Sequence, residues 1–169
     1  MEFYDVLKSR WSVRSFDDRK VEQDKIDRIL NVARTAPTAK NMQPVRILCA
    51  VSDNALEKLN SISPCIYNAP LVFIVCSDNS ACWTSPQGKS RGEMDASIAA
   101  THIMLAAANE GLGSCWVCMF DPQKLSKEFG LTENIVPQCL IVVGYPSSNA
   151  KPADRHFDRL PLSETVKYV

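Results

Sequence analysis

The sequence predicts a mixed α/β fold in which one β-sheet is flanked by helices. Four runs of β-type apolar residues alternate with segments of helical periodicity. An almost continuously apolar stretch at 98–108 marks one helix as more buried than the others. The chain has 169 residues, so we expect residues 1–169 to form a single domain.

Helices and strands alternate in the first half of the chain. Apolar residues have helical spacing within 2–9, and residues 22–36 show the i, i+3, i+4, i+7 pattern of an amphipathic helix. The segment 45–51 is a β-type run, and 54–62 is predicted to be helical. Residues 71–77 are apolar at successive positions, which is typical of a strand buried on both faces.

The second half continues this alternation after a polar loop at 78–92. Residues 114–120 form a third β-type run, and Asp121-Pro122 is a typical start for a short helix over 122–129. The fourth strand is predicted at 139–145. The segment from residue 146 onward contains three prolines and is expected to be an extended tail.

The longest predicted helix spans 91–110, about 30 Å at 1.5 Å per residue. Ser90 and Glu93 have the spacing of a capping box, and Gly111 is a natural C-terminal stop. The middle of this helix is apolar almost all round, so we expect it to be buried on every side. A homodimer that covers the helix explains this better than a single-chain core, which remains the alternative.

Composition excludes several classes of function. Nineteen basic and nineteen acidic residues give a net charge of zero, which argues against an electrostatic nucleic-acid binder or a polybasic membrane-surface protein. The charged N-terminus does not resemble a secretory signal, and no apolar stretch is long enough to span a bilayer. Seven cysteines cannot all pair internally, so we expect a reducing, cytoplasmic location.

The first candidate cluster is Arg10-Trp-Ser12-Val-Arg14. In an extended segment positions 10, 12 and 14 point to one side, where two guanidinium groups and a hydroxyl match the oxygens of a phosphate. Trp11 and Val13 would anchor the segment in the core. Two solvated arginines at the end of a helix are the simpler interpretation of the cluster taken alone.

The second cluster lies between two prolines, in the segment 36–44. Asn41 and Gln43 are two positions apart, so their carboxamides can share a side and match a heterocycle edge that alternates donors and acceptors, such as the pyrimidine end of a flavin. A turn at the end of a helix is an equally good interpretation.

The segment 110–116 and the CxxC pair are weaker indications of a functional site than the two clusters above. Gly113 has no Cβ, so a planar ligand can approach its backbone, although Gly111 is explained by the helix end alone. Cys115 and Cys118 would face opposite sides of a strand, so we predict buried structural thiols and no metal site. His102 on an apolar helix is expected to be a core or interface residue.

Taken in order, these motifs resemble the nitroreductase family of FMN-dependent oxidoreductases over nearly the whole chain. The resemblance is carried by Arg10-x-Ser12-x-Arg14-x-Phe16, by the segment 36–44, by Asp95 leading a long helix to 111–114, by 143–146 and by 159–162. It implies an α+β fold with a central, mostly antiparallel sheet of four to five strands, a long central helix, and an extended C-terminal tail exchanged in a homodimer.

The resemblance also implies two FMN sites at the dimer interface. Arg10 and Ser12 would contact the phosphate and ribityl chain, with Arg14 near the flavin pyrimidine. Gly113 and Ser114 would lie beside the isoalloxazine, and Arg159, with Arg155 as a further candidate, would complete the phosphate site. The residues expected to reach the FMN of the other protomer are Pro37, Thr38, Ala39, Asn41 and Gln43.

Two departures from the family pattern affect these expectations. The tail often has Lys-x-Arg in the family, but Phe157 stands where the lysine would be, so Arg155 is a candidate replacement. The 78–92 loop is short where larger members insert helices, which suggests an open acceptor site. Trp83 and Phe120 are candidates to stack on the acceptor, with ordinary packing as the alternative.

The implied reaction is electron transfer from NADH or NADPH through FMN to a nitroaromatic or quinone-like acceptor. Donor and acceptor would use the same pocket in turn, a ping-pong mechanism, and Arg14 would stabilise negative charge on the reduced flavin. Protons can come from water, so no catalytic side chain is assigned. The alternatives are a flavin-binding or flavin-delivery protein, a flavoenzyme with a donor other than a nicotinamide, and a thiol-based redox protein.

Overall fold

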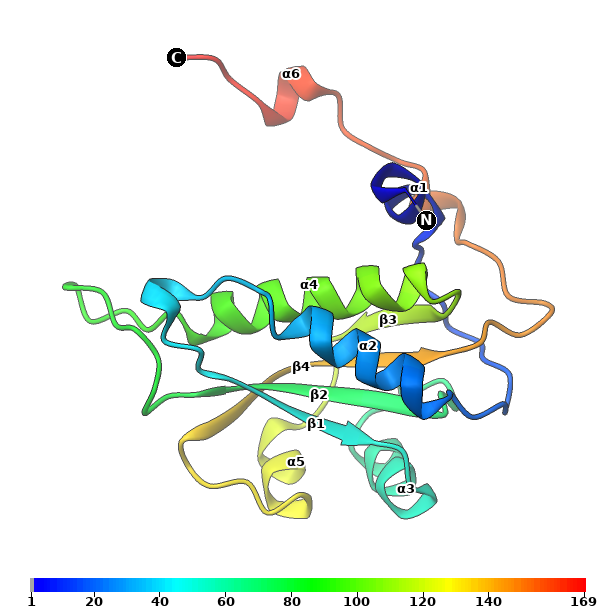
Figure 1. Ribbon diagram of the computed structural model, residues 1–169, viewed down its shortest axis with the longest axis horizontal. Helices are drawn as coiled ribbons and strands as arrows, with labels where there is room; N and C mark the ends of the chain where they lie inside the picture. The colour runs from blue at the N-terminus through cyan, green and yellow to red at the C-terminus, as the bar shows by residue number, and fades with distance from the viewer. Residues whose placement is uncertain (1) are drawn as a thin grey trace.

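The centre of the molecule is a four-stranded antiparallel sheet (Figure 1). A computed structural model describes residues 2–169. The strand order is β1-β2-β4-β3, and the strands are β1 (Val45–Ala50), β2 (Leu71–Asp78), β3 (Gly113–Val117) and β4 (Ile135–Gly144). All three ladders are antiparallel, which confirms the predicted α+β class and sheet type.

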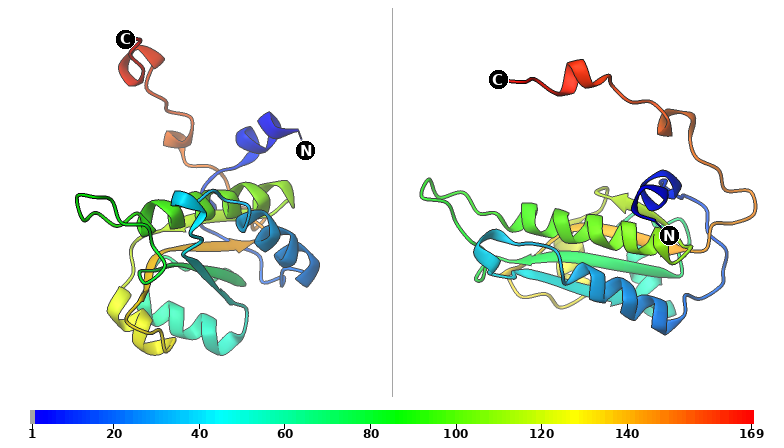
Figure 2. Two further views of the ribbon diagram at one scale, coloured as in Figure 1. Left: turned by 60° about the vertical axis from the view of Figure 1, so that its left-hand side comes forward. Right: turned by 45° about the horizontal axis from the view of Figure 1, so that its top comes forward.

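Helices cover both faces of the sheet. On one face lie α2 (Gln23–Ala33) and α4 (Gly92–Asn109), and on the other lie α3 (Asp53–Ile62) and α5 (Pro122–Glu128) (Figures 1 and 2). Side chains along a strand point alternately to opposite faces, so successive residues of the central strands β2 and β4 pack into the two different helix layers. Phe73 and Ile141 pack in the core under α2 and α4, whereas Ile74 and Leu140 pack in the core under α3 and α5.

The long helix α4 packs against β2, β3 and β4 and against α2. Ile103 is fully buried at the centre of this contact, a burial worth about 1.5–3 kcal/mol. Gly111 has a φ of +74°, and the Leu112 N–H donates to the Ala107 carbonyl at 2.9 Å, which is the predicted glycine stop in Schellman form. One strip of α4 stays partly exposed at His102 and Leu105, so the helix is not buried on every side within a single chain.

Three local predictions were wrong. The third strand ends at Val117 and not at 120. Ser90 does not form a capping box, because Arg91 is the N-cap residue and the Ser90 hydroxyl accepts a bond from the Gly92 N–H. The fourth strand starts at Ile135 and not at 139. Pro137 lies at a bulge, beyond the part of β4 that pairs with β3, so the missing N–H of proline is tolerated there.

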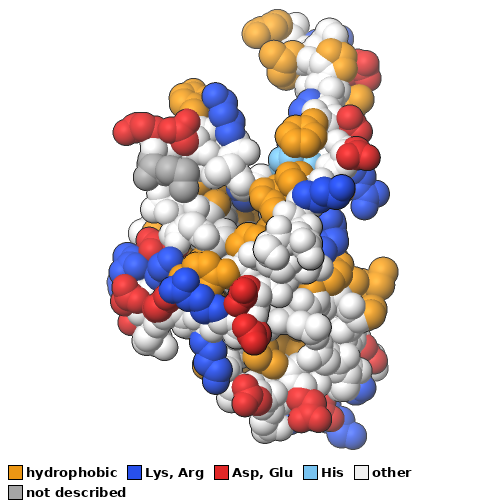
Figure 3. All heavy atoms as spheres, turned by 90° about the vertical axis from the view of Figure 1, so that its right-hand side faces the viewer, with side chains coloured by type: hydrophobic (Ala, Val, Ile, Leu, Met, Phe, Trp, Pro, Cys, Tyr) orange, Lys and Arg blue, Asp and Glu red, His pale blue; other side chains and the backbone are white. Residues whose placement is uncertain are grey.

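The two ends of the chain extend from the α4 side of the molecule (Figure 2). Helix α1 (Phe3–Ser9) lies against α4. The tail contains the short helices η2 (Asp154–His156) and α6 (Leu162–Thr165) and projects away from the body. It carries exposed apolar side chains along its length, among them Phe157, Leu162 and Tyr168 (Figure 3).

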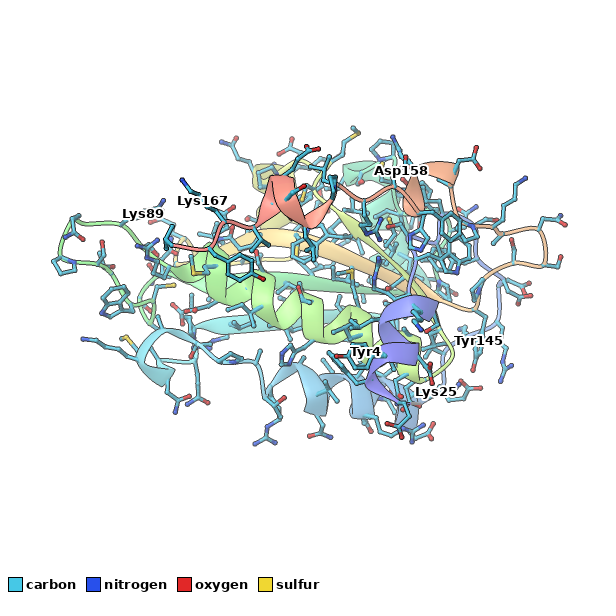
Figure 4. All side chains as sticks on the ribbon, turned by 90° about the horizontal axis from the view of Figure 1, so that it is seen from above. Tyr4, Lys25, Lys89, Tyr145, Asp158 and Lys167 are labelled. Carbon is cyan, nitrogen blue, oxygen red and sulfur yellow. The ribbon has the colours of Figure 1, made fainter. Side chains whose placement is uncertain are left out.

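A polar network ties α2 to the ends of β4 and α4. The Tyr145 hydroxyl donates to the Glu22 carboxylate at 2.7 Å, and the Lys25 ammonium donates to the Tyr145 hydroxyl at 3.0 Å and to the Glu110 carbonyl at 2.8 Å (Figure 4). Arg19 pairs with Glu22 from the preceding turn. The hydrogen bond from Tyr145, followed by further hydrogen bonds and Arg19, lowers the pKa of Glu22 from 4.5 to about 2.

This pKa shift predicts an acid-sensitive contribution to stability. Because the folded-state pKa of Glu22 lies below its unfolded value, the carboxylate stabilises the fold fully above about pH 4.5 and loses this effect as the pH falls toward 2. Glu22→Gln should therefore lower the thermal midpoint near pH 7, and its difference from the wild type should shrink in acid. Glu133→Gln is the control, since Glu133 has no ion pair within residues 2–169. An equal difference at both pH values would contradict this role.

Candidate functional site

The arginine segment, residues 10–14, runs beside the outer strand β3. Ser12 forms a parallel bridge with Ser114, and the Val13 N–H donates to the Ser114 carbonyl at 3.0 Å. Val13 is 1% exposed, as predicted for an anchor. Trp11 was also expected to be an anchor, but it is only partly buried and lines two cavities, because the segment lies on the rim of the sheet.

The predicted phosphate ligands gather around small cavities at this rim. Arg10 lines a cavity of about 210 Å³ together with Gly113 and Ser114. Ser12, Arg14 and Arg155 line another of about 190 Å³. Within residues 2–169 none of the three guanidinium groups has a carboxylate partner, so their positive charges are available to an anion.

Two predicted residues behave differently from this group. Arg159 donates to the carbonyls of His156 and Asp158, both at 2.6 Å, and so lies with the tail. At Gly113 a Cβ would lie 2.5 Å from a methyl carbon of Val13, so the space beside this glycine is filled by the arginine segment. The absence of a side chain at 113 is thus explained by packing, and a flavin contact at its backbone stays a prediction.

The predicted amide cluster forms a strained loop, residues 38–43, which we call the amide loop. It contains the short helix η1 (Ala39–Asn41), and Lys40, Asn41 and Gln43 have φ values of 52°, 56° and 51°. Left-handed conformations are unfavourable for side chains other than glycine, least so for asparagine. Asn41, Gln43 and the preceding Pro37 are exposed, so the loop presents both carboxamides to the surroundings.

Hydrogen bonds from three directions hold the amide loop in this conformation. Inside the loop, the Thr38 hydroxyl accepts from the Gln43 N–H at 3.0 Å. From β1, Arg46 donates to the Gln43 carbonyl at 3.0 Å. From the first turns of α4, the Asp95 carboxylate accepts from the Ala39 N–H at 3.0 Å. The sequence placed Asp95 in a motif but gave no sign of this contact, since an acidic residue near a helix N-terminus is common.

The arginine segment and the amide loop lie at opposite ends of α4 (Figure 1). The amide loop is bonded to Asp95, while Arg10 shares its cavity with Ala108, thirteen residues further along the helix. At 1.5 Å per residue the two groups are about 20 Å apart along the axis. The cavity lined by Thr38 and Gln43 is accordingly separate from those lined by Arg10 and Arg14.

The cysteines are free thiols, and those in the sheet are poorly suited to reaction. Burial raises the pKa of Cys115, of Cys139 and of Cys76, the last to about 12. Cys115 is buried as predicted. Cys118 is exposed just beyond the end of β3 at Val117, so the prediction of a buried structural thiol is wrong at this position. A thiolate at these buried positions would be scarce at neutral pH, which counts against the thiol-based alternative.

Comparison with known proteins agrees with this architecture. The model of the nitroreductase family matches residues 7–64 and 54–145. The chain belongs to the nitroreductase family. The crystal structure of a nitroreductase family protein from Clostridium difficile 630 superposes with a TM-score of 0.93 at 41% identity, over 99% of this chain and 98% of that one.

Two further relatives have more specific names. A protein of Methanothermobacter thermautotrophicus, provisionally named NADH dehydrogenase/NAD(P)H nitroreductase, is 30% identical over 91% of this chain and 82% of its own length. A provisionally named nitroreductase of Exiguobacterium sibiricum, solved in complex with FMN, has a TM-score of 0.86 at 19% identity, over 100% of this chain and 98% of that one. At this identity the second relative establishes a shared fold alone.

The two aromatic candidates of this nitroreductase-family chain have separate surroundings. Phe120 packs against the core under α3 and α5. Trp83 lies beside the amide loop, with the Lys40 ammonium 5.6 Å from its ring centre. Of the two, Trp83 is the one that contacts the amide loop, through Lys40, which is not itself a predicted site residue. In the described part of the chain, no helix is long and apolar enough to cross a membrane, and no cluster of three potential metal ligands occurs.

Proposed function

We propose that the protein is an FMN-dependent NAD(P)H oxidoreductase that works as a homodimer. Each FMN would be held by the arginine segment of one protomer and the amide loop of the other. The observation that carries this proposal is the separation of the two groups at opposite ends of α4, since a symmetric pair of chains can bring opposite ends of the same helix together. Membership of the nitroreductase family supports the same reaction class.

The residues at the rim fit FMN. A phosphate dianion is favoured by guanidinium groups without carboxylate partners, which Arg10 and Arg155 provide within residues 2–169. Within residues 2–169 the buried Ser114 hydroxyl has no hydrogen-bond partner, so a ligand at this rim could supply one. When bound, FMN supplies the redox chemistry. The protein's part is to hold the phosphate, to place Arg14 near the flavin pyrimidine and to present the carboxamides of Asn41 and Gln43.

The surface of the single chain supports dimerisation. A cavity of about 420 Å³ with an apolar floor lies between α1, α2 and α4, lined by Phe3, Val6, Val32 and Leu105 among others. Apolar side chains are also exposed along the tail (Figure 3), and exposed apolar surface that gathers in patches is typical of an interface. A second copy would cover the exposed strip of α4, and its tail would be exchanged across the interface.

The proposed acceptors are planar compounds such as nitroaromatics and quinones, reduced after the nicotinamide has left the same pocket. This ping-pong order follows from a single shared pocket on the flavin face. Trp83, which lies beside the amide loop, would form an aromatic wall of this pocket. Buried free cysteines are consistent with a cytoplasmic location, which is part of the proposal.

The proposal is tested by an absorbance spectrum of the purified protein, followed by anaerobic addition of NADH or NADPH. We expect flavin bands that bleach with one donor or both and return when a quinone is added. Flavin that stays oxidised with either donor would favour a storage or delivery role, or another donor. A colourless protein that does not take up added FMN would contradict the proposal.

A further inference from the structure

The amide loop adopts a conformation that its own sequence does not favour. Three side-chain-bearing residues have positive φ, and two of them, Lys40 and Gln43, are not among the residues that tolerate this region well. A short exposed segment with these residues would populate other conformations if it were not held. Contacts from outside the loop are therefore needed to hold it in this conformation.

Asp95, a buried residue of α4, makes one of these contacts with the amide loop. Its side chain is 2% exposed, and one carboxylate oxygen accepts from the Ala39 N–H at 3.0 Å. The other oxygen is buried without a partner in the described residues. A carboxylate buried with one oxygen unsatisfied is unfavourable for folding, although the N-terminal end of α4 offsets part of this. Stability alone does not explain an aspartate here.

A second hydrogen bond of the loop also involves Ala39. The Met42 N–H donates to the Ala39 carbonyl at 3.1 Å, which closes the turn that carries Lys40 and Asn41. The hydrogen bond from Gln43 to Thr38 closes the loop from the other side. Fixing the Ala39 N–H thus stabilises the turn, and with it the backbone position from which the Asn41 side chain projects.

We propose that Asp95 is a positioning residue for the flavin site: it holds the amide loop in its strained conformation before the cofactor binds, and so makes the loop complementary to FMN. This inference rests on the proposed function, because it assigns the loop to FMN. The inference goes beyond the proposed function because it makes part of the FMN affinity depend on a buried carboxylate that does not contact the cofactor. A loop that is already ordered loses less conformational entropy when the ligand binds, so the affinity is higher.

The test compares Asp95→Ala with Asp95→Asn, which keeps an oxygen able to accept from Ala39. Two quantities are measured: the Kd for FMN with the visible circular dichroism of the bound flavin, and hydrogen exchange of the Ala39 and Gln43 amides in the flavin-free protein. Asp95→Ala should raise the Kd about tenfold or more, alter the flavin spectrum and speed exchange at both amides. Asp95→Asn should restore most of each effect.

Ile103→Val is the matched control, since it weakens the buried face of the same helix without touching the loop. If Asp95→Ala does not fold, Asp95→Ser takes its place, because the shorter serine side chain does not extend as far toward the Ala39 N–H. A Kd and spectrum that change no more than in Ile103→Val would overturn the inference. So would an Asp95→Asn variant as impaired as Asp95→Ala. Failure of the wild type to bind FMN would instead contradict the proposed function.

Discussion

Replacing both Arg10 and Arg14 with alanine is expected to yield a colourless protein whose affinity for FMN is about a hundredfold lower or worse. Each hydrogen bond to or from a charged group is worth about 1.5–3 kcal/mol. The double variant removes at least one from Arg10 to the phosphate and one from Arg14 to the flavin pyrimidine. Neither arginine has an ion pair in the described part of the chain, so the flavin-free fold should keep its thermal midpoint. The measurements are flavin absorbance, a fluorescence titration with FMN, and thermal unfolding.

The matched control is the double variant Lys58→Ala and Lys124→Ala. It removes the same net charge from α3 and α5, on the opposite face of the sheet. This control should keep its flavin, because long-range attraction between separated surface charges is screened by salt. A colourless control would mean that net charge, and not the position of the arginines, governs binding. Full flavin occupancy in the arginine variant would overturn the phosphate assignment.

The second large effect concerns the composite site. A chain with Arg10→Ala and Arg14→Ala and a chain with Asn41→Ala and Gln43→Ala should each be nearly inactive as a homodimer. In a mixed dimer, one site combines two intact halves and the other combines two defective halves. Random pairing of equal amounts makes half of the dimers mixed, so activity should recover to about a quarter of the wild-type level.

This recovery separates the two possible arrangements of the site. If both halves of a site came from one chain, every site in the mixture would keep a defect and activity would stay near zero. Differently tagged chains, refolded or expressed together and purified through both tags, give the mixed dimer alone, with an expected half of the wild-type activity per dimer. A purified mixed dimer without activity would contradict a site shared between protomers.

The sequence predicted most elements because each carries a local signal. The periodicity of 22–36, the apolar run at 71–77 and the glycine at 111 report backbone preferences that tertiary contacts did not override. The errors lie where context decides. Local rules predict that a strand does not continue through Pro137, but the structure accommodates this proline beside a bulge where β4 pairs with β2 alone. Ser90 is a residue type that often caps helices, but it lies one position before the N-cap residue Arg91.

The candidate site was predictable in its parts and not in its arrangement. The side-chain types alone indicated which residues to consider: guanidinium and hydroxyl groups at Arg10, Ser12 and Arg14, and carboxamides at Asn41 and Gln43. The distance between the two groups, the positive φ values of the amide loop and the packing of Val13 against Gly113 have no such signal. They depend on which surfaces meet after folding.

The sequence by itself determined the element order, the family and the chemical character of both candidate groups, because these follow from side-chain type and spacing along the chain. Only the tertiary structure showed that α4 holds the two groups about 20 Å apart, since a helix converts sequence separation into a fixed length. Only the structure showed that Asp95 reaches Ala39 across 56 positions in the sequence. Such contacts join residues that are distant in the sequence, and local spacing carries no record of them.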